Sequence, residues 1–244
     1  MDKSKSIIRV FIAITFLYWI SLYIYVPTLP SYVNSKTVSL AAVGLVLSMY
    51  GLWQLILRIP FGVLVDVTGR RKMFISLGLL CSAVGAVLMA HGENVFIIGI
   101  GRAFTGLAAA TWVPLIAVFS SFFKAEKAVF ATSLLTFCAS FGRMLSTLSN
   151  GFLNGLGGYR LAFYCAAGAA VLSMVILLFS KIQRHTSAKF SIHSVGRILL
   201  RKEFLLPTLL SVVIMYGTWA ITYSFLPIRA HTLGANDIEM SILL

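Results

Sequence analysis

The chain has 244 residues, of which 59% are hydrophobic and only 11% are charged, and its mean hydropathy is +0.94. Because a soluble domain carries about 25% charged residues, this composition excludes a soluble globular protein and indicates an all-α integral membrane protein. The net charge of +13 would suggest nucleic-acid binding in a soluble protein, but its distribution along this chain indicates membrane topology instead.

Apolar runs long enough to span a bilayer follow one another along the chain. A transmembrane helix needs about 20 such residues. The expected helices cover residues 8–30, 40–65, 73–91, 95–122, 128–153, 161–181 and 204–228, and an eighth begins near Ile238 and is cut off at Leu244. Charges at the ends of these runs alternate as a serpentine chain requires, so we expect a multi-pass membrane protein.

The positive charge lies mainly on one side of the expected membrane. Most of the 20 lysines and arginines fall in loops on that side, whereas Lys36, Arg160 and Arg229 fall in loops on the other. Cytoplasmic loops carry such an excess. We therefore expect the plasma or bacterial inner membrane as the location, with the N-terminus in the cytoplasm. The lipid bilayer is then a partner and nucleic acid is not.

An internal repeat relates the first and seventh expected helices. Three aromatic residues and a proline recur at a constant offset: Trp19, Tyr23, Tyr25 and Pro27 match Trp219, Tyr223, Phe225 and Pro227. Transporters with parallel halves show this kind of repeat. It predicts a complete N-terminal six-helix bundle over residues 1–181 and an incomplete start of a C-terminal bundle over residues 204–244. The missing helices of the second bundle are thus an expected partner.

Residues 182–203 form the longest connection and the most basic stretch of the sequence. Apolar residues recur there at helical spacing, opposite a row of cations. Either an amphipathic helix on the inner leaflet or a plain solvated linker accounts for this pattern.

A short charged hinge separates the second and third expected helices. It holds two glycines, one acid and three consecutive cations: Gly62, Asp66, Gly69, Arg70, Arg71 and Lys72. Gly69 can take a positive φ where the chain reverses. Asp66 can accept hydrogen bonds from free backbone N–H groups or face a positive helix end. The hinge therefore predicts a tight cytoplasmic turn.

These residues resemble the motifs of a known family. The hinge pattern, with Gly62, Asp66 and Gly69 before the three cations, resembles motif A of the major facilitator superfamily, and Arg102-x-x-x-Gly106 resembles its motif B. The stretch at residues 25–32 is similar to that of many bacterial drug-exporter-like members, and residues 158–163 resemble a further junction of the family. The resemblance covers nearly the whole chain. It implies a twelve-helix transporter of two six-helix bundles that works by alternating access.

The resemblance also implies roles for individual residues. Motif A acts as a conformational latch, in which Asp66 faces the start of a helix in the second half. Arg70 pairs with an acid at the inner end of the fourth helix, where Glu126 is the candidate. Arg102 and Gly106 belong near the coupling or substrate path.

The fifth expected helix departs from the pattern of the family's proton antiporters. Their motif C carries a Gly-Pro pair between outer glycines. Here the outer glycines remain as Gly142 and Gly151, but Ser146 and Thr147 stand at the Gly-Pro positions. This departure counts against proton antiport and against drug export.

All seven acids fall at helix ends or in loops. In contrast, three arginines lie inside expected helices: Arg58, Arg102 and Arg143. A buried arginine faces a cavity or a partner. These residues either attract an anionic substrate or pair with groups of the missing half, and Arg58 is near enough to the inner surface to snorkel. The candidate cavity lining comprises Tyr18, Tyr25, Arg143, Thr147 and Asn150. Proton coupling needs a titratable group at membrane depth, and the expected helices show none.

These observations favour a secondary active transporter that moves a small organic solute by alternating access, and proton-coupled efflux of a drug or metabolite is the leading form. Uptake of an organic anion is an alternative within transport, and a non-transporting membrane scaffold or sensor is an alternative of another class. The sequence has no acid pair, nucleophile–base spacing or nucleotide loop, so we do not expect an enzyme. The three scattered cysteines form neither a disulfide framework nor a metal site, and we expect no metal or cofactor.

Overall fold

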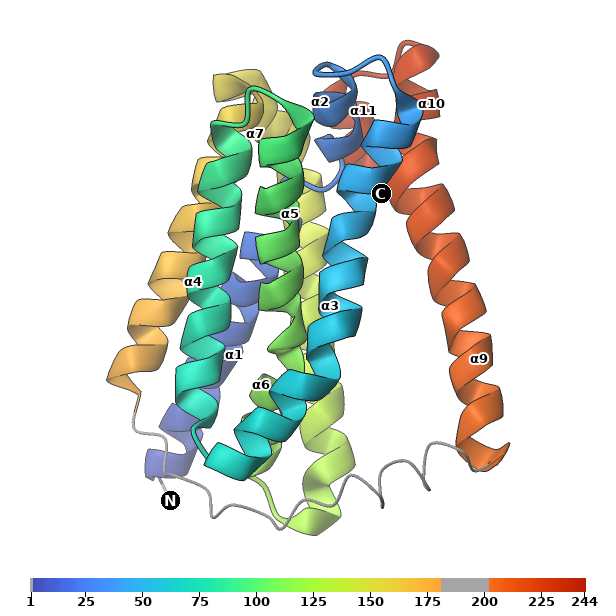
Figure 1. Cartoon of the computed structure of the whole chain (residues 1–244). Helices are drawn as coiled ribbons and strands as arrows, with labels where there is room; N and C mark the ends of the chain where they lie inside the picture. Colours follow the sequence, from blue (N-terminus) through green and yellow to red (C-terminus); the bar gives the residue numbers. More distant parts are fainter. Residues whose placement is uncertain (1, 181–201) are drawn as a thin grey trace.

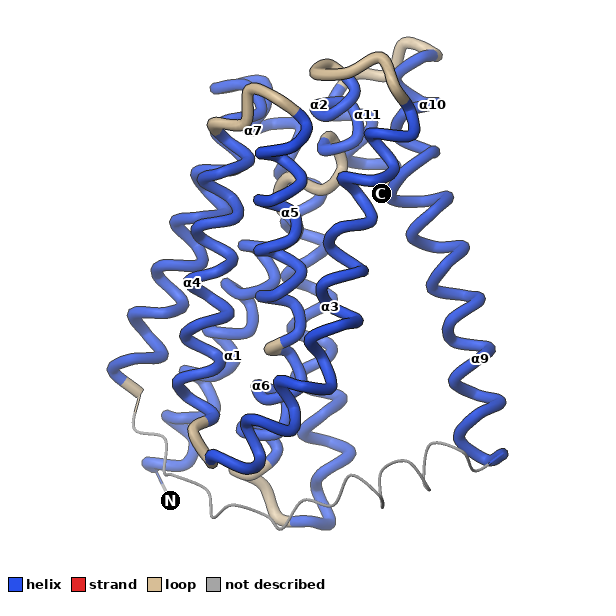
Figure 2. Tube along the Cα trace, in the orientation of Figure 1, coloured by secondary structure: helices blue, strands red, loops and turns tan. Residues whose placement is uncertain are grey.

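The computed structural model describes residues 2–180 and 202–244, and its regular structure in these ranges is entirely helical (Figures 1 and 2). The first part of the chain contains α1 (Asp2–Tyr23), α2 (Leu29–Asn34), α3 (Leu40–Thr68), α4 (Arg71–Ala90), α5 (Val95–Ala110), α6 (Trp112–Ser120), the short turn η1 (Ala125–Lys127) and α7 (Ala128–Phe179). The second part contains α9 (Lys202–Gly217), the π-helical segment η2 (Thr218–Phe225), α10 (Leu226–Thr232) and α11 (Asp237–Leu243). The all-α prediction is confirmed.

Six helical stretches of the described chain are long and apolar enough to cross a membrane. The longest, Ala125–Phe179, has 55 residues. At 1.5 Å per residue it would extend about 80 Å, more than twice the ~30 Å of a bilayer core. Gly157 (φ −148°, ψ 20°) and Gly158 (φ 65°) interrupt it, and Figure 1 shows the chain reversing there. The stretch therefore supplies the two crossings expected at 128–153 and 161–181.

Two expected helices are broken at prolines. The first ends at Tyr23 rather than at residue 30, and α2 follows after a turn. Pro27 accounts for this early end, because proline disfavours helical backbone at the residue before it. The fourth is divided at Thr111 into α5 and α6. Pro114 accounts for this division, since it has no N–H to offer the preceding turn.

The helices of the first part pack through close backbone contacts. α1 packs against α7, α3 against α5, and α4 against both α5 and α7. A Cβ on Gly85 would lie 2.6 Å from the carbonyl oxygen of Gly101, and a Cβ on Gly101 would lie 2.7 Å from that of Gly85. Membrane helices associate closely where small residues meet. These two glycines therefore fix the α4–α5 contact.

Different segments of the chain lie at the two ends of the bundle. The N-terminus, the α3–α4 turn, η1 and the start of α9 lie at one end, here called the basic end, and α2, α10 and α11 lie at the other, the far end (Figure 1). The cations of the hinge, together with Lys124 and Lys127, are therefore on the same side of the molecule, as the sequence predicts.

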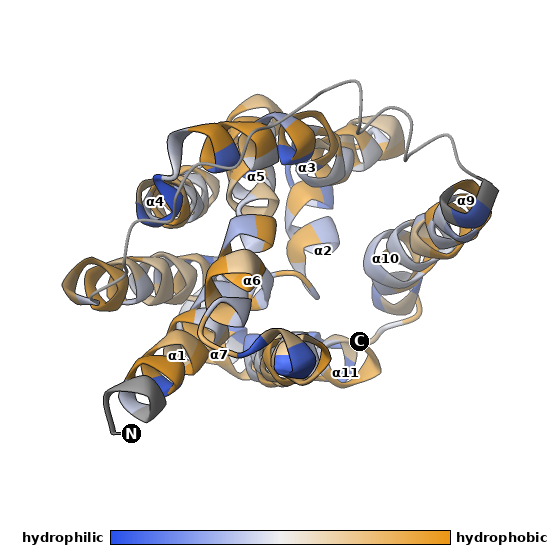
Figure 3. Ribbon diagram, turned by 90° about the horizontal axis from the view of Figure 1, so that it is seen from below, coloured by the Kyte–Doolittle hydropathy of each residue, from blue (hydrophilic) through white to orange (hydrophobic). Residues whose placement is uncertain are grey.

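The seventh crossing, α9 with η2 and α10, stands apart from the bundle at the basic end (Figures 1 and 3). No residue in its most apolar stretch is buried. Its contacts with the first part lie toward the far end, where η2 and α10 meet α2. The amphipathic helix weighed for residues 182–203 lies almost wholly outside the described residues.

Candidate functional site

Arg102 of α5 lies among tyrosine rings near the middle of the bundle. Its side chain is 2% exposed, and its Cζ lies 4.3 Å from the ring centroid of Tyr50 and 5.9 Å from that of Tyr25. Its Nη1 donates a long hydrogen bond of 3.4 Å to the Tyr25 hydroxyl, and its Nε has no partner in the described chain. Arg102 and Tyr25, both predicted as site residues, are therefore in direct contact.

Gly106, the second residue of the motif B pattern, explains this arrangement. A Cβ at Gly106 would lie 2.5 Å from the carbonyl oxygen of Tyr50. The glycine thus allows α3 to approach α5 closely, one turn beyond Arg102. This approach holds the Tyr50 ring over the guanidinium, an attractive cation–π geometry.

Arg143 of α7 lies over two rings of α1. Its Cζ is 4.7 Å from the Trp19 ring centroid and 5.6 Å from that of Tyr23, and its Nη2 donates to Ser140 Oγ at 2.9 Å. Unlike Arg102, its side chain is only partly buried. Of the described residues, no carboxylate forms an ion pair with either arginine.

Four rings from three crossings meet between the two arginines, and we call them the aromatic box: Tyr23, Tyr50, Trp219 and Tyr223. The Trp219 centroid lies 5.2 Å from that of Tyr50 and 6.4 Å from that of Tyr23, and the Tyr23–Tyr223 distance is 6.2 Å. Such pairs attract each other beyond their area burial. Residues that the repeat relates, Tyr23 and Tyr223, are therefore in direct contact. The segment η2, which presents Trp219 and Tyr223, is π-helical, a geometry that is frequent at functional sites.

Two of the predicted cavity residues have hydroxyls that are bonded to backbone carbonyls. The side chain of Tyr18 is fully buried, and its hydroxyl donates to the carbonyl oxygen of Ala108 at 2.7 Å. Thr147 is 5% exposed, and its hydroxyl donates to the carbonyl oxygen of Met144 on its own helix at 2.9 Å. Both hydroxyls are thus satisfied by backbone.

Asn150 belongs to a buried polar network at the far end. The Thr28 hydroxyl donates to Asn150 Oδ1 at 2.9 Å, and Asn154 Nδ2 donates to Thr28 Oγ1 and to Asp237 Oδ2, each at 2.9 Å. This far-end network joins the start of α2, where Thr28 is the N-cap residue, to α7 and α11. The sequence did not predict it beyond Asn150, although Asn150 and Asn154 are four residues apart and share a helix face.

Gly151 brings α11 directly against α7. Its backbone N–H donates to Ser241 Oγ at 2.7 Å. A Cβ here would lie 2.5 Å from the Cα of Ile238 and would also meet the carbonyl oxygen of Asp237. This glycine remains from the motif C pattern, and it allows the start of the eighth crossing to seal against the fifth.

The hinge has the expected turn but a different ion pair. Gly69 has φ 62° and caps α3, with its N–H bonded to the Val65 carbonyl at 2.9 Å. Asp66 lies 3.8 Å from Arg71 Nη2. Glu126, which was expected to pair with Arg70, is exposed in η1, and the ion pairs of the described residues do not include that pair.

Lys72 of the hinge binds the end of α7, a contact that the sequence did not predict. Its Nζ donates to the carbonyl oxygens of Leu178 at 2.7 Å and of Ser180 at 2.8 Å. These carbonyls lie at the C-terminal end of α7, where the helix dipole favours a cation. The hinge is therefore tied to the sixth crossing of its own bundle.

Replacing Lys72 with methionine is expected to lower the stability of the bundle by about 1 kcal/mol, because the last carbonyls of α7 lose their charged donor. Thermal unfolding in detergent, together with amide hydrogen exchange at residues 174–180, measures the effect. Lys124→Met removes an exposed cation from the same end and serves as the control. Equal effects of the two changes would contradict the capping role.

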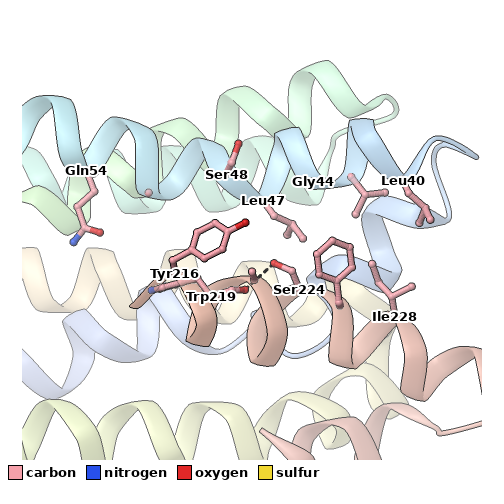
Figure 4. Close-up of a pocket in the computed structure, with 13 residues that line it drawn as sticks. Leu40, Gly44, Leu47, Ser48, Gln54, Tyr216, Trp219, Ser224 and Ile228 are labelled. Atoms are coloured by element: carbon pink, nitrogen blue, oxygen red, sulfur yellow. Dashed lines mark hydrogen bonds between the residues drawn. The ribbon is translucent and has the colours of Figure 1, made fainter. Parts of the chain in front are cut away.

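A cavity of about 290 Å³ lies between α3 and the seventh crossing. Figure 4 shows Gln54, Ser48 and Leu47 on one side, with Tyr216 reaching into the space from the other. The Ser224 hydroxyl donates a hydrogen bond of 3.0 Å to the carbonyl oxygen of Trp219 on its own helix. The lining is mostly apolar and aromatic with a few polar groups, as in sites for small organic molecules.

Among curated proteins, the chain is similar to bacterial proteins that are named for drug resistance. The chain is 26% identical over 247 residues to quinolone resistance protein NorA of Staphylococcus aureus, which covers 93% of this chain and 60% of the relative. It is 27% identical over 188 residues to multidrug resistance protein 1 of Bacillus subtilis, which covers 74% of this chain and 46% of the relative. The chain thus spans about 60% of the length of the first relative.

Comparisons of fold and family agree with each other. A bacterial homolog of the human lysosomal transporter Spinster superimposes with a TM-score of 0.75 at 17% identity, covering 99% of this chain and 58% of that structure. A D-xylose–proton symporter superimposes with a TM-score of 0.61 at 16% identity, covering 97% and 64%. The family model described as Major Facilitator Superfamily matches residues 11–244. The chain is a multi-pass membrane protein that belongs to the major facilitator superfamily.

Proposed function

We propose that the protein is a secondary active transporter that exports small organic molecules, including drug-like compounds, across the plasma membrane by alternating access. The observation that carries the proposal is the arrangement of the seventh crossing. It meets the bundle at the far end through η2 and α10, and it stands apart at the basic end. A contact that is confined to one end suits a two-state rearrangement in which one half of the fold rotates against the other. The names of the resistance-protein relatives support the choice of export and of substrate class.

The proposal places the basic end in the cytoplasm, with the N-terminus inside. The cations gathered at that end support this orientation through the positive-inside rule. In this arrangement the structure is open toward the cytoplasm, and the far-end network and Gly151 close it toward the outside. The solute enters from the inside and meets the aromatic box and the two arginines.

The hinge is proposed to act as the latch that closes the inner side. Asp66 is partly exposed, with 48% of its side chain accessible, and its only ion pair in the described chain is the long contact with Arg71. It is therefore available to a helix N-terminus of the second half, an interaction of about 1 kcal/mol at a partly exposed site. A bias of this size shifts a two-state equilibrium by about fivefold.

Asp66→Asn is accordingly expected to slow transport by about fivefold while leaving the affinity for the solute nearly unchanged. The reason is that the amide keeps the side-chain shape but loses the charge that favours the inner-closed state. Transport rate and binding are measured separately, and Glu93→Gln, an exposed acid at the far end, is the control. A large loss of affinity in Asp66→Asn would instead assign Asp66 to the binding site.

Proteoliposomes test the function directly. The purified protein is reconstituted, a pH gradient is imposed, and the flux of a panel of neutral, cationic and anionic aromatic compounds, including ethidium, is followed in both directions. We expect gradient-dependent efflux of at least one compound, abolished by a protonophore. Flux that responds to no gradient for any compound would contradict a coupled transporter, and accumulation in the opposite direction would favour the uptake of an organic anion.

A further inference from the structure

The centre of the site holds positive charge, and two of its buried hydrogen-bond donors have no acceptor among the described residues. Arg102 and Arg143 form no ion pair with a carboxylate of the described residues. Arg102 Nε and Trp19 Nε1 are buried, and neither has a hydrogen-bond partner there. Buried donors of this kind are costly unless something accepts from them. Both groups can only donate, so the complementary group must be an acceptor.

The two arginines differ in how open they are to a ligand. Arg102 is 2% exposed and lies between the rings of Tyr25 and Tyr50. Arg143 is only partly buried, and among the described residues its guanidinium donates to Ser140 and interacts with the Tyr23 hydroxyl, two partners for five N–H groups. Arg143 therefore retains free donors at an accessible position. Its guanidinium plane is held by the Trp19 and Tyr23 rings below it, so little orientation is lost when a ligand binds.

The rings beside Arg143 suit a flat aromatic body. Tyr23 contacts Arg143 and also Trp219 and Tyr223 of the seventh crossing. A planar solute next to Arg143 thus meets aromatic faces from both halves of the fold, and such contacts favour offset or edge-on stacking. The geometry joins one anion-binding group to several stacking surfaces.

From these observations we infer that the exported solutes include planar aromatic anions, whose carboxylate or similar group is bound by Arg143 together with the indole N–H of Trp19. This inference rests on the proposed function, which it makes more specific. A carboxylate offers the guanidinium two acceptor oxygens in matching geometry, which a neutral amide does not. Arg143 is then a specificity-determining residue of the solute site.

A matched pair of probes tests the inference. Equilibrium binding of 2-naphthoate and of 2-naphthamide to the purified protein compares the same ring system with and without the charge. Wild type is expected to bind the naphthoate about tenfold more tightly, as a charge-assisted hydrogen bond provides. Arg143→Gln is expected to remove this preference, and Arg143→Lys to keep part of it. Trp19→Phe keeps the ring but loses the N–H, so it should weaken naphthoate binding and leave naphthamide binding unchanged.

Arg9→Gln is the matched control, because Arg9 is an exposed arginine on α1, ten residues before Trp19 and nearer the basic end. It should retain the full preference. Equal binding of the two probes to wild type, no binding of either, or an unchanged preference in Arg143→Gln would overturn the inference.

The proposed function is tested separately, by the flux measurement in proteoliposomes described above. Gradient-driven efflux of ethidium with no naphthoate preference overturns only the inference, and a preference without any gradient-driven flux overturns only the transport function.

Discussion

Gly106→Ala is expected to destabilise the bundle by about 2 kcal/mol and to reduce transport at least as strongly. The new Cβ would lie 2.5 Å from the Tyr50 carbonyl oxygen and 3.1 Å from its Cα, so the conflict is with backbone and no side chain can rotate away. Relief requires α3 to move from α5, which also moves the Tyr50 ring off Arg102. Thermal unfolding in detergent and ethidium efflux measure the two consequences.

Gly51→Ala is the matched control for this change. Gly51 follows Tyr50 on α3, and a Cβ there would meet no atom within 4 Å. Because alanine is a better helix former than glycine by about 1 kcal/mol, the control should leave stability unchanged or raise it. If Gly106→Ala is as stable and active as Gly51→Ala, the close approach of α3 and α5 is not needed, and the account of the motif B glycine is wrong.

Gly151→Ala is expected to open the far end. A Cβ at this position meets the backbone of Asp237 and Ile238, so α11 must move away from α7. That movement breaks the bond from the Gly151 N–H to Ser241 and strains the Asn154–Asp237 contact. A change of about 2 kcal/mol against the outer-closed state shifts the two-state equilibrium more than tenfold, and export should fall accordingly.

Gly155→Ala lies one turn further along the same helix and has no atom within 4 Å of its Cβ. It tests whether loss of a glycine from α7 is harmful in itself, and it is expected to behave as wild type. Outer accessibility is read from the labelling of a cysteine introduced at Ser146, a buried position one turn from Asn150 and outside the far-end network, with the three native cysteines replaced. Labelling should rise in the Gly151→Ala background and remain low with Gly155→Ala; equal labelling in both would contradict the role of the seal.

Much of the fold follows from local sequence signals. Apolar runs predict the crossings because a bilayer demands about 20 such residues in each. Pro114 predicts the division of the fourth crossing, and Gly69 predicts the left-handed end of α3, because both effects act within one turn of the chain. The early end of α1 was missed, although Pro27 is visible in the sequence, because the apolar pattern continues beyond it.

The site was predictable only in part, because it depends on contacts between distant segments. Tyr25, Arg143 and Asn150 were expected to line one cavity, but the structure places Asn150 in the far-end network. The bond from Lys72 to the end of α7 and the contact of Tyr23 with Tyr223 join residues more than 100 positions apart. No periodicity reports such pairs. The repeat includes three of the four residues of the aromatic box, Tyr23, Trp219 and Tyr223, but it does not indicate that they touch.

Alternating access makes one prediction that a single distance can test. Spin labels are placed at Val67 and Leu206, exposed positions at the basic ends of α3 and α9, and the distance distribution is measured by pulsed electron paramagnetic resonance in wild type and in Gly151→Ala. If opening the far end is coupled to closing the basic end, the Gly151→Ala protein shows a population with a clearly shorter distance than wild type. An identical, single distance in both proteins would contradict alternating access.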